Sequence, residues 1–172
     1  MHRAGVIFGM LILLFSGALG GASAASSRAE TSITAMLDGY PIKPEQISRF
    51  YCHDFAYPVI TCFRTASRLA GATADHVRAN SALAATAGTG DYVTIFDGAN
   101  FSGTIMNLSQ NYDALAAIGW NDRISSFQAH NSASGTFWTD WFATGTPLNF
   151  CCNSSVGSIG SYDNQLSSVY RH

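Results

Sequence analysis

Charged side chains are scarce in this sequence, and their scarcity limits the partners that it can have. Only 12% of the 172 residues are charged, and the formal net charge is −2 at pH 7. Surfaces that bind nucleic acids or anionic membranes are rich in lysine and arginine. We therefore expect no nucleic acid and no membrane among the partners. Serine, threonine, asparagine and glycine must form much of the surface instead.

No apolar run is long enough to span a bilayer, and the longest one lies near the start of the chain. It extends from Val6 to Phe15, follows the positive pair His2-Arg3, and precedes the small-residue pattern Ala22-Ser23-Ala24. A membrane span needs about 20 apolar residues, whereas this arrangement is typical of a secretory signal. We predict that residues 1–24 are a signal peptide and that the protein is secreted, to the extracellular space or the periplasm. An uncleaved signal anchor is the alternative.

Two common cysteine patterns are also missing. The four cysteines, Cys52, Cys62, Cys151 and Cys152, include no CxxC pair and no histidine at metal-ligand spacing, which argues against a zinc site. Cysteines of an exported protein are usually oxidised, which argues against a catalytic thiol and favours disulfide bonds. We expect Cys52 to pair with Cys62, closing a short local loop. Cys151 and Cys152 are then bonded to each other or elsewhere.

Residues 25–90 form an N-terminal extension of mixed composition. Its best strand candidates are the short apolar segments Ser48–Tyr51 and Pro58–Phe63. The spacing of apolar residues in an alanine-rich stretch predicts one helix from Thr65 to about Ala87, followed by a flexible joint at Gly88–Gly90. The sequence leaves open whether this extension is a docking segment, a pro-segment or an integrated part of the fold.

After Gly90 the sequence changes to short aromatic and β-branched runs separated by Gly, Asn, Asp and Ser. Such runs are typical of strands joined by tight turns. Their regular spacing predicts a mainly β fold with an antiparallel sandwich. The predicted strands are Tyr92–Phe96, Thr104–Leu108, Arg123–Ala129, Thr136–Thr139, Pro147–Cys151 and Gln165–Tyr170.

An internal repeat divides this region into two copies, residues 91–131 and 132–172. They align without a gap at an offset of 42 residues, which carries Phe96 onto Trp138. One copy cannot bury its inner face alone, so we expect the two copies to pack around a single core. Further aligned pairs are Gly103 and Gly145, Asn107 and Asn149, Trp120 and Tyr162, and Ser125-Ser126 and Ser167-Ser168.

Two motifs recur in the region. The first is an aromatic residue, four spacers, a second aromatic, one residue and glycine, seen as Phe96, Phe101 and Gly103. The second is Asn/Asp-Asn/Asp-x-x-Ser-Ser, present as Asn121–Ser126 and Asp163–Ser168. In these motifs the second half of the chain resembles the βγ-crystallin superfamily, in its calcium-binding, microbial secreted type. The resemblance implies a two-motif Greek-key β-sandwich (βγ-crystallin-like) over residues 91–172.

The second copy departs from the hairpin motif at one position. Ala143 stands where the family has an aromatic residue, and Phe142 beside it is the candidate for the same space. In the family, the last serine of each loop hydrogen-bonds into the folded hairpin, a role that falls here on Ser126 and Ser168. The resemblance is thus more complete for the first hairpin than for the second.

The resemblance also implies two Ca²⁺ sites between the paired copies. Calcium takes about six to eight oxygen ligands, and one loop supplies only about half of them: a carboxylate or amide, a backbone carbonyl and a serine hydroxyl. The partner copy is expected to complete each shell. One implied site joins Asp122, the Arg123 carbonyl and Ser125 to the Thr139 carbonyl. The other joins Asn164, the Gln165 carbonyl and Ser167 to the Asp97 carbonyl.

The two implied sites differ in charge. Asp122 offers a carboxylate, whereas the aligned Asn164 offers a neutral amide. Fewer charges lower the affinity of a site for a hard cation, so we expect the Asp122 site to be the tighter one. Both sites should lie in the weak extracellular range, about micromolar to millimolar.

The resemblance therefore implies a secreted, non-enzymatic protein whose fold is stabilised by bound calcium. An alternative on the same scaffold is a secreted peptidase inhibitor or killer-toxin-like protein, with an extracellular protein as its target. An enzyme that uses the N-terminal part ranks last, because no serine lies in a GxSxG context and the histidines form no recognisable catalytic set. These histidines are His53, His76, His130 and His172.

Overall fold

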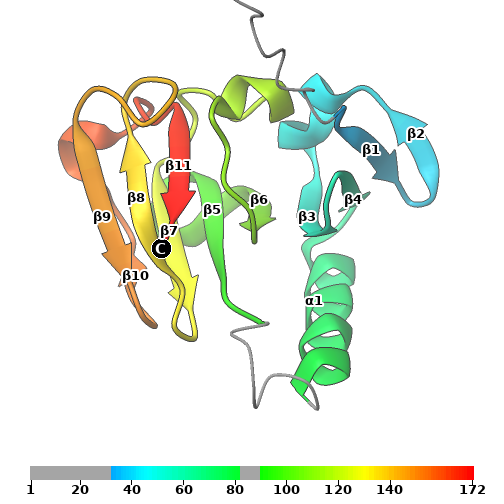
Figure 1. Cartoon of the computed structure of the whole chain (residues 1–172). Coiled ribbons are helices and arrows are strands. Elements are labelled where there is room, and N and C mark those ends of the chain that lie inside the picture. Colours follow the sequence, from blue (N-terminus) through cyan, green and yellow to red (C-terminus); the bar gives the residue numbers. More distant parts are fainter. Residues whose placement is uncertain (1–31, 82–89) are drawn as a thin grey trace, which may run out of the picture. The chain divides into compact units, whose positions relative to one another are not determined.

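Strands dominate the part of the chain that the computed structural model describes, residues 32–81 and 90–172 (Figure 1). These residues contain eleven strands, one α-helix and four short 3-10 helices. The predicted mainly β fold is therefore confirmed. No helix within these two ranges is long and apolar enough to cross a membrane. The predicted signal peptide, residues 1–24, lies outside the described residues.

The elements follow one another in a simple order. The strands are β1 (Thr34–Leu37), β2 (Tyr40–Ile42), β3 (Tyr51–Ala56), β4 (Val59–Phe63), β5 (Tyr92–Gly98), β6 (Ser102–Leu108), β7 (Ser126–His130), β8 (Ser134–Trp138), β9 (Pro147–Cys151), β10 (Ser155–Val156) and β11 (Ser168–Arg171). The helices are η1 (Pro44–Arg49), α1 (Ala66–Ser81), η2 (Ala99–Phe101), η3 (Leu115–Ile118) and η4 (Gly160–Tyr162).

The two repeat copies exchange strands between two sheets. One sheet has the order β10-β7-β5-β6-β3-β4-β1-β2, and the other has the order β11-β8-β9. β10 of the second copy pairs with β7 of the first, where Val156 faces Phe127. In return, Tyr112 of the first copy bridges Val169 of the second, and Val169 is the repeat equivalent of Phe127. Each copy thus completes the other's sheet, as a pair of Greek keys does.

Both copies contribute to one apolar core. Val93 and Ile95 are fully buried. Phe127 of the first copy lies 5.5 Å from Phe137 and 5.9 Å from Phe150 of the second, measured between ring centroids. Burying a side chain of this size stabilises the fold by about 2 kcal/mol. Neither copy can form this core alone, as the repeat predicts.

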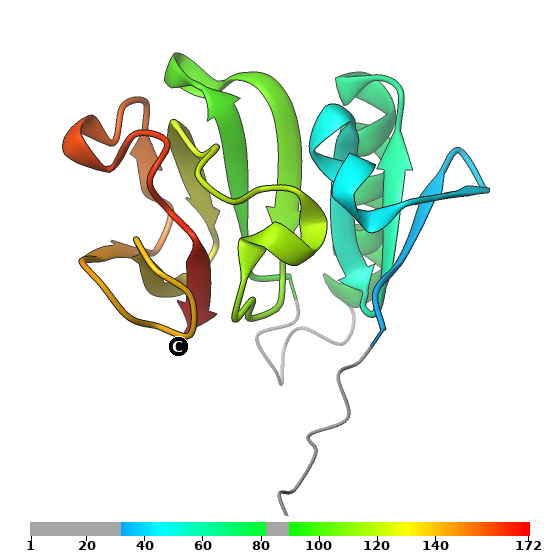
Figure 2. The ribbon, with the colours of Figure 1, turned by 90° about the horizontal axis from the view of Figure 1, so that it is seen from above.

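The N-terminal extension continues the sheet of the first copy. β3 runs parallel to β6, with Cys52 opposite Met106. Figures 1 and 2 show β1 to β4 on one side of β6 and the second copy on the other. The described part of the extension, residues 32–81, is therefore integrated into this sheet.

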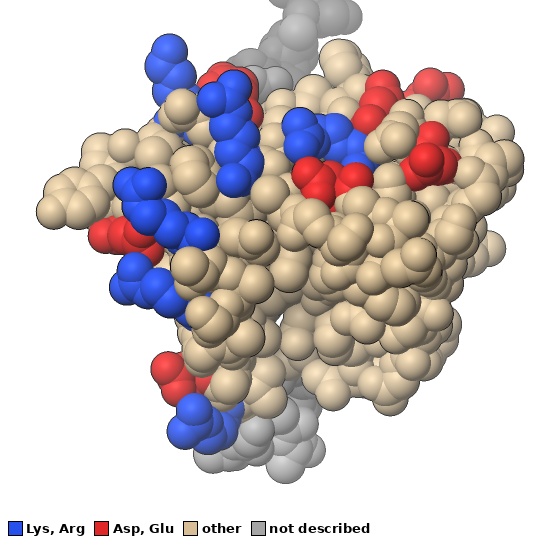
Figure 3. Space-filling model, turned by 180° about the vertical axis from the view of Figure 1, so that it is seen from behind, with Lys and Arg blue, Asp and Glu red and all other residues tan. Residues whose placement is uncertain are grey.

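The extension also differs from the crystallin-like half in charge. It carries most of the described basic residues, and Figure 3 shows lysine and arginine side chains gathered on one part of the surface beside a large uncharged area. The basic residues of the extension are Lys43, Arg49, Arg64, Arg68 and Arg78.

Helix α1 begins where the sequence predicts. The Thr65 hydroxyl accepts a hydrogen bond of 3.4 Å from the Arg68 amide and so caps the first turn. The helix is described as far as Ser81, and its predicted continuation to Ala87 lies outside the described residues. Leu69 is buried, and the His76 ring stacks on Phe55 of β3 at 4.1 Å. These contacts hold α1 against the extension strands.

One predicted strand of the extension is wrong and another is confirmed. The strand expected at Ser48–Tyr51 is absent, because Pro44–Arg49 forms η1 and β3 begins only at Tyr51. Proline favours the first turn of a helix, where its missing N–H has no partner to lose. The strand expected at Pro58–Phe63 is present as β4. The cysteine pairing is confirmed too, since Cys52 and Cys62 are bonded across the β3–β4 pair.

Candidate metal centre

The first two strands of the first copy are joined by a folded hairpin. Asn100, Phe101 and Gly103 have positive φ angles of 55°, 62° and 85°. Glycine is needed at position 103, because a Cβ there would lie 1.9 Å from Asp97 Oδ1. The same carboxylate oxygen accepts a hydrogen bond of 2.7 Å from the Thr104 amide. Asp97 therefore fills the space that the glycine leaves and locks the hairpin.

The second hairpin keeps this backbone geometry despite Ala143. Phe142, Ala143 and Gly145 have φ angles of 58°, 57° and 79°. Thr139 replaces Asp97, and its hydroxyl accepts a hydrogen bond of 2.9 Å from the Thr146 amide. Phe142 is 65% exposed, so it does not fill the space that an aromatic at position 143 would take. The departure from the family pattern removes an aromatic contact but not the hairpin.

The last serine of each loop is tied to its own hairpin. The Ser126 hydroxyl donates to the Gly98 carbonyl at 2.7 Å, and the Ser168 hydroxyl donates to the Asp140 carbonyl at 2.7 Å. Both serines are fully buried. The structural role predicted for these two residues is confirmed. Each loop is thereby held at a fixed place beside a hairpin.

The two loops face each other across an approximate twofold axis. The Asp122 amide donates to the Leu166 carbonyl at 3.0 Å, and the Asn164 amide donates to the Ile124 carbonyl at 3.0 Å. These two bonds are repeat equivalents of each other. Asp122 and Asn164 also share a positive φ of 54°. The second residue of each loop therefore lies against the other copy.

The Asp122 carboxylate is the centre of one group of oxygens. Its Oδ1 accepts a hydrogen bond of 2.9 Å from the Ser167 hydroxyl of the other copy. The Ser167 amide donates to the Trp138 carbonyl at 2.8 Å, which places Ser167 beside the backbone of Thr139. A carboxylate of the first copy and a hydroxyl of the second are thus in direct contact.

A side-chain relay leads from this carboxylate to the second hairpin. Asp122 Oδ2 accepts from Asn121 Nδ2 at 2.7 Å, and Asn121 Oδ1 accepts from the Trp141 indole at 2.7 Å. Trp141 is 48% exposed. Its ring therefore lies two hydrogen bonds from the carboxylate, where its fluorescence should respond to a change at Asp122.

The second group of oxygens is looser. The Ser125 hydroxyl lies 3.4 Å from the Asp97 carbonyl, and the Ser125 amide donates to the Phe96 carbonyl at 2.9 Å. The structure thus brings Ser125 to the hairpin of its own copy and Ser167 to the loop of the other. The implied ligand sets place Ser125 with Asp122 instead, and Ser167 with Asn164.

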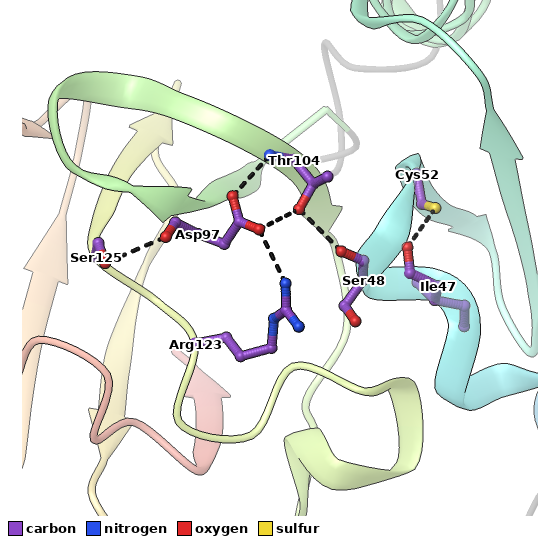
Figure 4. Close-up of polar contacts among 7 residues, drawn as sticks. All are labelled: Ile47, Ser48, Cys52, Asp97, Thr104, Arg123 and Ser125. Carbon is purple, nitrogen blue, oxygen red and sulfur yellow. Dashed lines mark hydrogen bonds and ion pairs between the residues drawn. The ribbon is translucent and has the colours of Figure 1, made fainter.

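Opposite charges lie close to this second group. Figure 4 shows the Asp97 carboxylate between Thr104 and Arg123, whose guanidinium is 3.0 Å from Asp97 Oδ2. The Thr104 hydroxyl lies 2.7 Å from Asp97 Oδ2 and 2.9 Å from the Ser48 carbonyl of η1, so its one proton is shared between two acceptors. The Asp97 side chain is occupied by these partners, which leaves its backbone carbonyl as the oxygen that faces Ser125.

These oxygens suit a hard cation better than a transition metal. No group of three or more His, Cys, Asp or Glu side chains occurs among the residues that the structure describes. Zinc sites are built from such groups, whereas calcium also accepts carbonyl, amide and hydroxyl oxygens. The arrangement of Asp122, Ser167 and the hairpin backbone can offer ligands of the second kind.

Two residues that support this region were not predicted from the sequence. Asn121 holds the Asp122 carboxylate, and Ser48 anchors Thr104 from the extension. Asn121 lies inside the loop motif next to Asp122, and this position could have suggested it as a hydrogen-bond partner of the carboxylate. Ser48 has no signal in the sequence, because its contact depends on where η1 packs.

Comparisons with known proteins found similarities among solved structures. No protein-family model and no curated protein matches the chain. A βγ-crystallin from Ciona intestinalis is 23% identical with a TM-score of 0.44, over 47% of this chain and 99% of that one. An archaeal βγ-crystallin is 21% identical with a TM-score of 0.43, over 48% and 98%. A βγ-crystallin domain from Clostridium beijerinckii is 21% identical with a TM-score of 0.42, over 47% and 97%. This likeness concerns the fold alone.

Proposed function

We propose that this chain is a secreted, non-enzymatic protein that binds calcium between its two repeat copies and is stabilised by it. The observation that supports the proposal most directly is the contact between Asp122 Oδ1 and the Ser167 hydroxyl, 2.9 Å across the copies. Two oxygens from different copies, already this close, can bind one cation with little rearrangement.

The contacts suggest how the ligands divide between two sites. The Asp122 site takes the Asp122 carboxylate from one copy and the Ser167 hydroxyl and Thr139 carbonyl from the other. The Asn164 site takes the Asn164 side chain together with the Ser125 hydroxyl and the Asp97 carbonyl. The Arg123 and Gln165 carbonyls, next in the chain, are further candidates for the respective sites.

The proposed sites are weak and unequal. The Asp122 site has one formal negative charge, and the Asn164 site has none among its side-chain ligands. Near the latter, Arg123 is neutralised by Asp97 at 3.0 Å. Sites with so few charges bind calcium in the range of about 10⁻⁴–10⁻³ M, as extracellular modules do.

Thermal melting of the chain in excess calcium and in excess chelator tests the proposal. A ligand at about 100 times its Kd stabilises the native state by about 2.7 kcal/mol, which for a chain of this size corresponds to about 8 °C in Tm. We expect a shift of several degrees with calcium and a smaller one with magnesium, which keeps more of its water. Equal Tm values in calcium and chelator would contradict the proposal.

A matched pair of variants separates metal binding from general charge effects. Asp122→Asn removes the carboxylate of the tighter site, whereas Asp75→Asn removes an exposed carboxylate on α1 that pairs with Arg78. We expect Asp122→Asn to lose much of the calcium-dependent shift and Asp75→Asn to keep it. Equal loss in both variants would show that calcium acts through net charge only.

A further inference from the structure

A pocket of about 780 Å³ lies between α1 and the face of β5, β6 and β7 that points away from the sandwich core. The helix turns its small side chains toward this space, with Ala66, Ala70 and Ala74 one turn apart. Because these side chains are short, they leave the gap between helix and sheet unfilled. The sheet side contributes the larger apolar residues Phe96 and Ile105.

The floor of the pocket is polar and already ordered. Thr94 donates to Asn107 Oδ1 at 2.8 Å and lies 2.9 Å from His130 Nε2. Asn107 donates in turn to the Thr73 hydroxyl of α1 at 2.9 Å. Burial lowers the pKa of His130, which favours the uncharged form of its ring. The floor therefore offers hydrogen-bonding groups without a formal charge.

One polar side chain of the pocket has no hydrogen-bond partner among the described residues. Gln128 lines the pocket and is half-buried, and its side-chain amide makes no hydrogen bond to another described residue. Among the described lining residues, Arg78 alone is charged, and it is largely exposed and paired with Asp75 at 2.7 Å. A charged ligand would thus lose its hydration in the pocket without gaining a free counter-charge.

We propose that this pocket binds a neutral, mainly apolar small molecule that carries one hydrogen-bonding group, which pairs with Gln128. Its volume lies within the range of about 300–1,000 Å³ that is usual for small-molecule sites, and such sites combine apolar walls with a few polar groups. The apolar body of the ligand packs between the alanine face of α1 and the Phe96 and Ile105 side chains. This site is separate from the proposed calcium sites.

Two fluorescent probes that differ only in charge test the proposal. N-phenyl-1-naphthylamine is neutral and has one N–H, and 8-anilino-1-naphthalenesulfonate adds a sulfonate to the same rings. We expect the neutral probe to bind the wild-type chain saturably, at one per chain, and at least tenfold more tightly than the sulfonate. No saturable binding of the neutral probe, or tighter binding of the sulfonate, would overturn the proposal.

Substitutions on two faces of α1 locate the bound probe. Ala70→Trp fills the pocket, whereas Ala79→Trp adds the same ring nine residues later, on the opposite and exposed face of the helix. We expect Ala70→Trp to abolish binding of the neutral probe and Ala79→Trp to preserve it. Ala74→Leu is a milder pocket variant if Ala70→Trp does not fold, and it should weaken binding at least fivefold.

Two further outcomes would show that the pocket does not bind the probe as proposed. Unchanged binding in both pocket variants would mean that the probe lies on exposed aromatic residues elsewhere. Sedimentation of the wild-type chain as a dimer that the probe dissociates would mean that a second copy covers the pocket. Either result would overturn the proposal.

Discussion

The two repeat copies share several internal hydrogen bonds but have different surroundings. Thr94 donates to Asn107 at 2.8 Å, and the equivalent Thr136 donates to Asn149 at 2.8 Å. Asn107 is nevertheless 4% exposed under α1, whereas Asn149 is open to solvent. The repeat thus determines the hydrogen bond within each copy, and the N-terminal extension determines that Asn107 is buried while Asn149 is not.

The turn after the second strand shows the same contrast. In the first copy, the carboxylate of Asp54 accepts hydrogen bonds from the Ser109 and Gln110 amides, at 2.6 and 3.2 Å. The repeat equivalents of these two residues are Cys151 and Cys152, which are bonded to each other. One turn is held by the extension and the other by a local covalent bond.

Removing Asp54 should cause the largest loss of stability, because the extension holds the first copy's turn through this residue. Its carboxylate is fully buried and also accepts from the Tyr112 hydroxyl at 3.0 Å. Burial raises the pKa of Asp54, while these hydrogen bonds oppose the rise. Asp54→Ala leaves three donors unpaired, and we expect a loss of about 4 kcal/mol in the free energy of unfolding. Denaturant titration measures it, and a loss no larger than that of Asp75→Ala would contradict the role of Asp54.

The second largest difference should be between the stabilities that the two disulfides contribute. The Cys52–Cys62 bond closes a loop with a sequence separation of 10, so the double alanine variant should lose about 3 kcal/mol. The Cys151–Cys152 bond closes almost no chain, so its removal should cost less than about 1 kcal/mol. Chemical denaturation of the two double variants compares them. A greater loss for the adjacent pair would contradict this ranking.

Glycine at position 119 marks where the extension packs on the first copy. Its φ is 72°, and a Cβ there would lie 2.6 Å from the Glu45 carbonyl of η1. The equivalent residue of the second copy is Ser161, which is exposed. We expect Gly119→Ala to lower the free energy of unfolding by about 2 kcal/mol and Ser161→Ala to change it by less than about 0.5. Similar Tm values for the two variants would contradict the predicted difference between the copies.

A substitution at Asn164 should make the two proposed calcium sites more alike. Asn164→Asp introduces the carboxylate that the first loop already has in Asp122, and the side chain stays on an exposed loop. We expect about tenfold tighter calcium binding at the weaker site, with little change in stability without calcium. Calorimetric titration measures both. Unchanged affinity would mean that Asn164 is not a ligand.

The crystallin-like fold could be predicted because its signals are local and occur twice. The aromatic-glycine hairpins, the paired serines and the 42-residue offset from Phe96 to Trp138 all depend on short stretches of chain. The structure bears out their consequences, including the roles of Ser126 and Ser168. Two predicted strand starts are wrong: β7 and β11 begin at the last serine of each loop, later than Arg123 and Gln165.

What could not be predicted depends on packing between distant segments. No pattern in the sequence predicts that β3 pairs with the edge of β6 or that Asp54 hydrogen-bonds to the turn at Ser109. The same holds for the pairing of Ser167 with Asp122, because the choice between two nearly symmetric partners depends on how the copies face each other. The eight proposed ligands come from the family resemblance, and their binding of calcium stays a prediction.

Calorimetric titration with calcium of three alanine variants tests the central proposal most directly. Wild type should show two binding events. Asp122→Ala and Ser167→Ala should each remove the same event, the tighter one, because these residues contribute to one site across the copies. Ser125→Ala should remove the other. If Asp122→Ala and Ser125→Ala removed the same event, or if wild type bound no calcium, the proposed cross-copy sites would be wrong.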